Sequence, residues 1–160
     1  MKKKIIYIDM DDVICDFIQA YNKEREEKPH IKYPQSQEGF FLNLQPIPQS
    51  IEVINKLRSL DFFDVYILTA PSVKNPLCYT EKRLWIERNF DLEMAEKLII
   101  SPNKGLNKGD YLIDDNIHGK GQEHFEGEII HFGNEKVKSW SDVWSFFSAR
   151  YGIGETLAGQ

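Results

Sequence analysis

The sequence predicts an α/β fold in which helices flank a central parallel sheet. Short apolar runs alternate along the chain with segments of helical spacing, and this alternation is typical of repeated β-α-β units. Several runs also end abruptly in polar residues, as buried parallel strands do at the edge of a sheet. The five runs that we expect to form strands cover residues 5–8, 65–68, 98–100, 111–113 and 129–132.

Four other segments predict helices. Residues 13 to about 28 mix apolar and charged side chains at helical spacing. Residues 50–60 carry apolar side chains at intervals of three or four, with Ser50 as the expected cap. Thr80 is expected to cap a third helix, and Ser141 to begin the last one.

The length of 160 residues fits one domain. We place this domain at residues 1–150 and expect residues 151–160 to form a flexible tail. No internal repeat or low-complexity block divides the chain.

Charge and composition limit the class of partner. The 25 acidic and 20 basic residues give a net charge of -5, which argues against binding nucleic-acid polymers or anionic membranes through bulk positive charge. No apolar run reaches the roughly 20 residues of a membrane span, and the run after the basic start is too short for a signal peptide. The two cysteines, Cys15 and Cys78, lack metal-binding spacing and suit a reducing compartment. We therefore expect a cytoplasmic protein.

Polar side chains follow four of the predicted strands and would meet at one edge of the sheet, where ligands bind in such folds. They are Asp9, Asp11, Thr69, Lys104, Asp114 and Asp115. Four carboxylates in one place raise one another's pKa unless a cation lies among them. Oxygen ligands with open positions suit Mg²⁺, which keeps several waters and takes only one or two carboxylates. The pattern therefore predicts a Mg²⁺ site.

The same residues point to phosphate chemistry. The Thr69 hydroxyl and the Lys104 ammonium would bind phosphate oxygens, although Lys108 offers a similar charge nearby. Asp9 is suited to attack phosphorus and form an aspartyl-phosphate. Asp11, two positions later, would first protonate the leaving group and then activate a water.

The motif DMDDV at residues 9–13 resembles the DxDx(V/T) signature of the haloacid dehalogenase-like (HAD) phosphatases. Thr69 is similar to their second motif, Lys104 to their third, and Asp114-Asp115 to their acidic fourth, in the same order along the chain. Within this superfamily the chain resembles the 5'(3')-deoxyribonucleotidases over most of residues 4–147. The stretches that carry this resemblance are DMDDVICDF, FFLNLQPIP, YILTAP, YTEKRLWIERNF, LIDD and SWSDVW.

The resemblance implies a role for each motif residue. Asp9 would be the phospho-acceptor, and Asp11 the general acid and base. Asp115, alone or together with Asp114, would hold the metal. The implied metal-binding group is Asp9, Asp11 through its backbone carbonyl, Asp114 and Asp115. The implied phosphate-binding residues are Thr69 and Lys104.

The resemblance also implies a Rossmann-like HAD core with a small helical cap, about residues 15–45, inserted after the first strand. Phe17 matches a position that lines the nucleoside pocket in these nucleotidases, and Phe40 and Phe41 would contribute there or pack in the core of the cap. The chain departs from the family here, because about 27 residues separate Asp12 from Phe40 and better-known members carry a longer insert. The expected substrate is a small phosphorylated molecule, foremost a nucleoside monophosphate, with its base and sugar left open.

Two other functions fit part of this pattern. One is a HAD phosphatase for another small phosphate ester. The other is a phospho-acceptor signalling domain of the receiver type, which also uses acidic residues, a Thr, a Lys and Mg²⁺. In receivers the acidic pair comes first and the Lys last, whereas Thr69 and Lys104 here precede the second acidic pair. The order of the motifs favours the hydrolase, and the sequence leaves a homodimer open.

Overall fold

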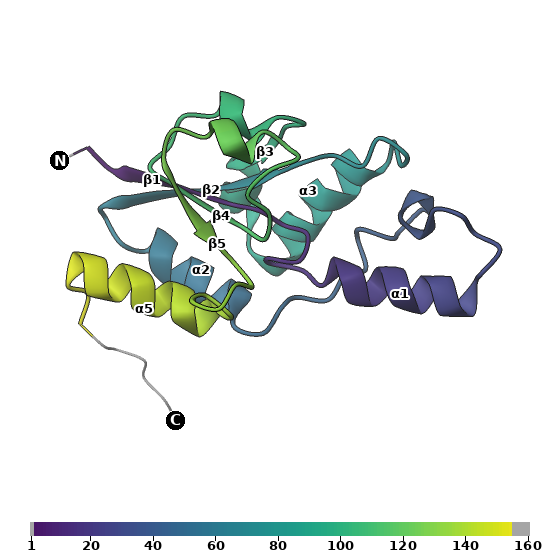
Figure 1. Ribbon diagram of the computed structural model, residues 1–160, viewed down its shortest axis with the longest axis horizontal. Helices are drawn as coiled ribbons and strands as arrows, with labels where there is room; N and C mark the ends of the chain where they lie inside the picture. Colours follow the sequence, from purple (N-terminus) through teal and green to yellow (C-terminus); the bar gives the residue numbers. More distant parts are fainter. Residues whose placement is uncertain (1, 155–160) are drawn as a thin grey trace.

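A five-stranded parallel sheet forms the centre of the molecule in the computed structural model, which describes residues 2–154 (Figure 1). The strands are β1 (Lys4–Ile8), β2 (Phe63–Thr69), β3 (Leu98–Ile100), β4 (Tyr111–Asp114) and β5 (Glu128–His131). They lie side by side in the order β3-β2-β1-β4-β5. Each predicted strand overlaps one of these, and the predicted α/β fold is confirmed.

Helices and short 3-10 segments cover the two faces of the sheet. They are α2 (Ser50–Arg58), α3 (Cys78–Asn89), α4 (Leu92–Glu96), α5 (Trp140–Tyr151), η2 (Lys104–Leu106) and η3 (Gln122–His124). Figure 1 shows α2 and α5 together on one side of the sheet and the green 3-10 segments on the other. Within residues 2–154, no helix is long and apolar enough to cross a membrane.

Side chains of β1 alternate between two apolar clusters, one on each face of the sheet. Ile6 and Ile8 belong to the larger cluster, which also takes side chains from α2, α3 and α5. Tyr7, between them, belongs to a smaller cluster with Leu68 and Leu112. Because both faces of β1 are buried, its sequence is a continuous apolar run rather than an alternating one.

The cap lies between β1 and α2 and contains α1 (Phe17–Glu27) and η1 (Pro34–Ser36). In Figure 1 it extends away from the sheet toward the side of α3. Phe40, Phe41 and Leu44, near its end, are buried in the larger apolar cluster. The cap therefore shares its core with the sheet.

Two tryptophans of the core hold the two ends of the cap. The indole N–H of Trp140 donates to the carbonyl of Val13 at 2.7 Å, before α1 begins. The indole N–H of Trp85 donates to the carbonyl of Leu44 at 2.8 Å, where the cap returns toward α2. All four residues are buried, so both hydrogen bonds are shielded from water.

The first predicted helix starts later than the sequence pattern indicates, because α1 begins only at Phe17. The N–H groups of residues 13–15 all donate to the carbonyl of Met10 and form tight turns instead. Asp12 has a left-handed backbone with a φ of 61°. Asp16 then caps α1 with its side chain. Residues 13–16, which the sequence pattern assigns to the helix, belong instead to the loop that follows β1.

Two predicted helix caps are wrong. Gln49, rather than Ser50, precedes α2, and the Ser50 hydroxyl donates instead to the carbonyl of Ile14 at 3.1 Å. Thr80 lies inside α3, which already begins at Cys78. In both cases a polar side chain near a helix start was mistaken for the cap itself.

The last helix and the predicted tail also differ from expectation. α5 begins at Trp140, one residue before the predicted start at Ser141, and Ser139 caps it in a reciprocal capping box with Asp142. Tyr151, placed in the flexible tail by the sequence, is still part of α5. The rest of that prediction falls largely on residues 155–160, which lie outside the described residues.

Candidate active site

The carboxyl ends of three neighbouring strands bring the predicted residues to one edge of the sheet. Ile8, the last residue of β1, is aligned with residues near the ends of both β2 and β4. Asp9 follows β1 directly, β2 ends at Thr69, and β4 ends at Asp114. The parallel arrangement therefore gathers side chains that are far apart in the sequence.

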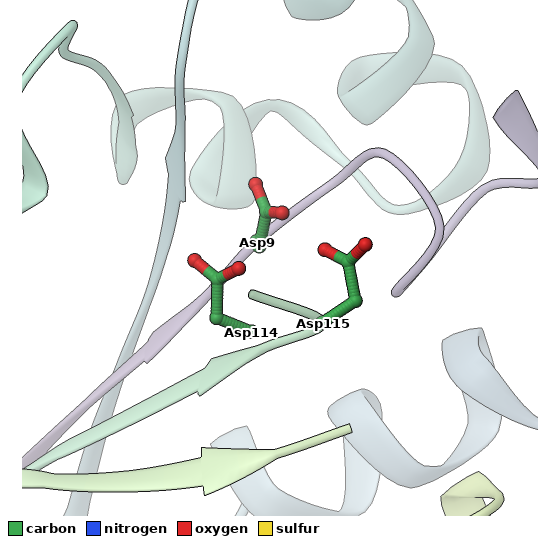
Figure 2. Close-up of side chains that lie close together, drawn as sticks. All are labelled: Asp9, Asp114 and Asp115. Carbon is green, nitrogen blue, oxygen red and sulfur yellow. The ribbon is translucent and has the colours of Figure 1, made fainter. Parts of the chain in front are cut away.

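Asp9, Asp114 and Asp115 form an acidic cluster at this edge. Each offers one carboxylate oxygen, and the three oxygens lie within 4.8 Å of one another. Figure 2 shows their carboxyl groups at the ends of β1 and β4, facing a common space. Asp9 is 6% exposed and Asp114 is fully buried, so neither charge is well solvated. The cluster therefore needs nearby positive charge.

Lys104 supplies part of that charge. Its Nζ lies 2.8 Å from Oδ1 of Asp9 and 2.5 Å from Oδ2 of Asp114. Burial lowers the pKa of Lys104, but the two carboxylates outweigh this effect and the net pKa is raised. The backbone N–H of Lys104 donates to the carbonyl of Lys120 at 2.7 Å, which fixes the start of η2. Lys104 is therefore a held, positively charged side chain.

Asp115 is the member of the cluster that is left without compensation. Its Oδ1 is buried and has no hydrogen-bond partner within residues 2–154. Burial, together with the charges of Asp9 and Asp114, raises the pKa of Asp115 to about 8. Three converging carboxylates, one of which has a buried oxygen without a partner in the described residues, match the ligand preference of a hard divalent cation such as Mg²⁺. The acidic cluster therefore fits a metal site.

Asp11 has a different environment from the acidic cluster. Its Oδ2 accepts a hydrogen bond at 2.9 Å from Nζ of Lys82. Burial raises the pKa of Asp11, and the charge of Lys82 only partly opposes this. A carboxyl group with a raised pKa can carry a proton closer to neutral pH, which suits a general acid.

Lys82 is a residue of this site that the sequence prediction did not select. It is fully buried, and its Nζ also donates to Oγ1 of Thr69 at 2.6 Å and to the carbonyl of Ala70 at 2.9 Å. Its position could have been found from helical spacing, because Lys82 lies on the same face of α3 as Cys78 and Trp85. A lysine on an apolar helix face indicates a buried partner, and here the partners are Asp11 and Thr69.

The three predicted pocket aromatics pack against one another beside this site. The ring of Phe17 lies 5.4 Å from that of Phe40 and 6.0 Å from that of Phe41. The ring of Phe41 in turn lies 5.2 Å from Nζ of Lys82. Phe17 is only partly buried, whereas Phe41 is 1% exposed and belongs to the core.

A cavity of about 420 Å³ lies between α1 and residues 37–45. Phe40 lines this cavity, but the acidic cluster does not. The cavity is therefore separate from the edge of the sheet where the carboxylates meet.

Comparison with known proteins identifies several relatives. A family model described as "5' nucleotidase, deoxy (Pyrimidine), cytosolic type C protein" matches residues 22–150. A Vibrio phage KVP40 protein named "Putative 5'(3')-deoxyribonucleotidase" is 36% identical, over 92% of this chain and 86% of its own. The human "5'(3')-deoxyribonucleotidase, cytosolic type" is 26% identical, over 87% of this chain and 90% of its own.

The fold also resembles that of solved structures. The structure of the HAD-hydrolase YfnB from Bacillus subtilis, bound to magnesium, aligns with a TM-score of 0.61 and 12% sequence identity. The alignment covers 91% of this chain and 99% of that one. At this low identity the likeness concerns the fold alone.

Proposed function

Because this chain belongs to the 5'(3')-deoxyribonucleotidase family of HAD hydrolases, we propose that it removes the phosphate from deoxyribonucleoside monophosphates. The chain is a hydrolase of the phosphomonoesterase class, as its family membership shows. The observation that carries the finer proposal is the ion pair between Lys104 and Asp9 within the acidic cluster, at the sheet edge where β2 ends in Thr69. The receiver alternative is disfavoured by motif order, because Thr69 and Lys104 precede the second acidic pair, Asp114 and Asp115.

The proposed reaction has two steps, with Asp9 as the nucleophile of the first and a water as the nucleophile of the second. A carboxylate oxygen of Asp9 attacks phosphorus, and the ester P–O bond breaks as the new O–P bond forms. Asp11 gives its proton to the departing alkoxide, which its raised pKa favours. Asp11 then takes a proton from a water that attacks the aspartyl-phosphate, which releases inorganic phosphate and restores Asp9. The sum consumes one water for each ester bond.

The proposed metal ligands are the acidic cluster and the backbone carbonyl of Asp11. Bound Mg²⁺ would neutralise charge on the phosphate and lower the repulsion between two anions. The residues of the chain perform the other tasks. Lys104 holds Oδ1 of Asp9, which orients the nucleophile.

The proposed phosphate contacts are Thr69 and Lys104, and the geometry adds Lys82 to them. Lys82 donates a hydrogen bond to Oγ1 of Thr69, so its positive charge lies beside the hydroxyl that would meet the phosphate. Phe17 is the proposed contact for the nucleoside, since it is the partly exposed member of the aromatic group. A cytoplasmic location fits two free cysteines, both of them buried.

The purified protein with Mg²⁺ is expected to hydrolyse dUMP and dTMP with a higher kcat/KM than sugar phosphates of similar size. The expectation follows from family membership and from the aromatic group beside the phosphate contacts. A phosphate-release screen of nucleoside monophosphates, sugar phosphates and p-nitrophenyl phosphate measures it. Equal kcat/KM for all esters would contradict the proposed substrate class. If acetyl phosphate phosphorylates the protein but the protein hydrolyses none of these esters, the assignment as a phosphatase is contradicted.

The metal-free protein is expected to lose stability as the pH rises from about 6 to about 8. The pKa of Asp115 is about 8 in the folded protein because of burial, Asp9 and Asp114, and about 4 in an unfolded chain. Between these values the folded protein holds a proton that the unfolded chain has released, so a rise in pH favours unfolding. Mg²⁺ binds the ionised form, so its stabilising effect is expected to be larger at the higher pH.

Thermal unfolding in EDTA and in Mg²⁺ at the two pH values measures this effect. The variant Asp115→Asn serves as the control, because it removes the titrating group, and its Tm in EDTA is expected to depend less on pH. A Mg²⁺-induced rise in Tm that is the same at both pH values would contradict the assignment of Asp115 to the metal site.

A further inference from the structure

Glu81 is a buried carboxylate that the proposed reaction does not use. It is 5% exposed and lies on α3, directly before Lys82. Its Oε1 accepts a hydrogen bond from the backbone N–H of Gly39 at 2.6 Å, and its Oε2 accepts one from the N–H of Phe41 at 3.0 Å. Both donors belong to the cap, so a side chain of the core holds the backbone of the cap.

A second buried side chain holds the preceding residues of the cap. Asn75 is 1% exposed and lies in the connection between β2 and α3. Its Nδ2 donates to the carbonyl of Gln35 at 3.0 Å and to that of Gln37 at 3.3 Å. Its Oδ1 accepts from the N–H of Leu77 at 3.0 Å, which fixes the orientation of the amide. Residues 35–41 are therefore attached to the core through two polar side chains.

The segment held in this way carries the aromatic side chains of the proposed pocket. Phe40 and Phe41 contact each other at 5.3 Å between ring centroids, and both contact Phe17. Because Phe41 also lies against the ammonium of Lys82, any shift of its backbone changes the distance from the aromatic group to the phosphate contacts. Adjacent residues of α3 thus serve two parts of one site. Glu81 holds the cap, and Lys82 holds Asp11.

We propose that Glu81 is a positioning residue that fixes residues 39–41 relative to the phosphate contacts and thereby sets the preference for nucleoside monophosphates. The inference rests on the proposed function, because it assigns the aromatic group to the nucleoside. A carboxylate accepts from two backbone N–H groups at once, and charged acceptors give the stronger hydrogen bonds. The amide of a glutamine accepts through one atom only and directs its own N–H₂ at the second donor. Glu81→Gln therefore releases one of the two attachment points with little change in volume.

The test compares two substrates in Glu81→Gln, with Glu87→Gln as the matched control. Glu87 lies on the same helix and pairs with Arg83 at the surface, away from the cap. In Glu81→Gln, KM for dUMP is expected to rise about tenfold while kcat changes less than about twofold. Both constants for p-nitrophenyl phosphate, which lacks a nucleoside, are expected to stay within about twofold of the original protein. The control is expected to match the original protein on both substrates.

An equal loss on both substrates would overturn the proposal, because Glu81 would then support only the catalytic centre or the fold. No change on either substrate would overturn it as well. If the original protein shows no preference for dUMP over p-nitrophenyl phosphate, the proposed substrate class fails, and the selectivity assigned to Glu81 fails with it. That outcome is distinguished from the first two because it appears before any substitution is made.

Hydrogen exchange gives a second readout that does not depend on substrate. At least one of the amides of Gly39 and Phe41 is expected to exchange at least about tenfold faster in Glu81→Gln, and both are expected to be unchanged in Glu87→Gln. Unchanged exchange at these two amides would overturn the attachment itself. If Glu81→Gln does not fold, Asn75→Ala releases the neighbouring attachment point, and the same separation of the two substrates is expected there.

Discussion

Replacing Asp9 by Asn is expected to lower kcat for phosphate esters by about four orders of magnitude or more. An amide oxygen is a poor nucleophile, and an aspartyl-phosphate cannot form at this position without the carboxylate. The substitution also removes the charge of Asp9 from the acidic cluster, so the pKa of Asp115 is expected to fall toward its ordinary value. Stability without metal is therefore expected to stay equal or to rise, while activity is lost.

Single-turnover hydrolysis of p-nitrophenyl phosphate measures the loss, and mass spectrometry of acid-quenched protein detects the phosphorylated residue. Asp61→Asn is the matched control, since Asp61 is exposed and lies in the turn before β2. The control is expected to keep normal activity and the same mass shift on residues 1–12 as the original protein. Normal turnover in Asp9→Asn would contradict the covalent mechanism.

Replacing Lys82 by Met is expected to lower kcat by about 10²–10³-fold, the usual effect of removing one preorganised positive group from a phosphate site. Met preserves most of the volume but leaves Asp11 and Thr69 without their shared donor. Because the charge of Lys82 lowers the pKa of Asp11, that pKa is expected to rise further in the variant. In the pH–rate profile, the apparent pKa that reflects the ionisation of Asp11 is therefore expected to move to higher pH.

The same substitution is expected to cost about 3 kcal/mol in the free energy of unfolding. This is the lower part of the range for a broken buried pair, because the Asp11 side chain keeps 28% exposure and can take up a proton. Urea unfolding and a pH–rate profile measure the two effects. Arg83→Met, at the next and exposed position of α3, is the control and is expected to change neither. A Lys82→Met variant with normal kcat would contradict the phosphate role.

The centre of the sheet was predictable because β1, β2 and β4 are largely buried. Such strands leave apolar runs in the sequence. The partly buried edge strand β3 is also apolar, and its residues 98–100 were predicted with the observed bounds. The start of α1 was not predictable from periodicity, because the turns around Met10 use residues that also suit a helix. Local hydrogen bonds of this kind depend on the sheet that the loop crosses.

The site was predictable to the extent that its residues follow strands. Asp9, Thr69 and Asp114 could be placed because the ends of parallel strands share one edge. Lys82 could not be placed this way, because it reaches the edge from the middle of a helix. The role of Glu81 could not be predicted from the sequence either. Its partners are backbone N–H groups of the cap, and every residue except proline has such a group, so no residue type marks them.

The indole hydrogen bonds at the two ends of the cap affect which step limits the rate of turnover. A lid that swings needs hinge residues that absorb changes in backbone angle. Val13 and Leu44 occupy the positions where such hinges would be, and each carbonyl is bound to a buried tryptophan. Rigid-body opening would break both bonds and draw Phe41 out of the core. Substrate entry and product exit are therefore expected to depend on fast local side-chain motion, so that no slow opening step limits the rate.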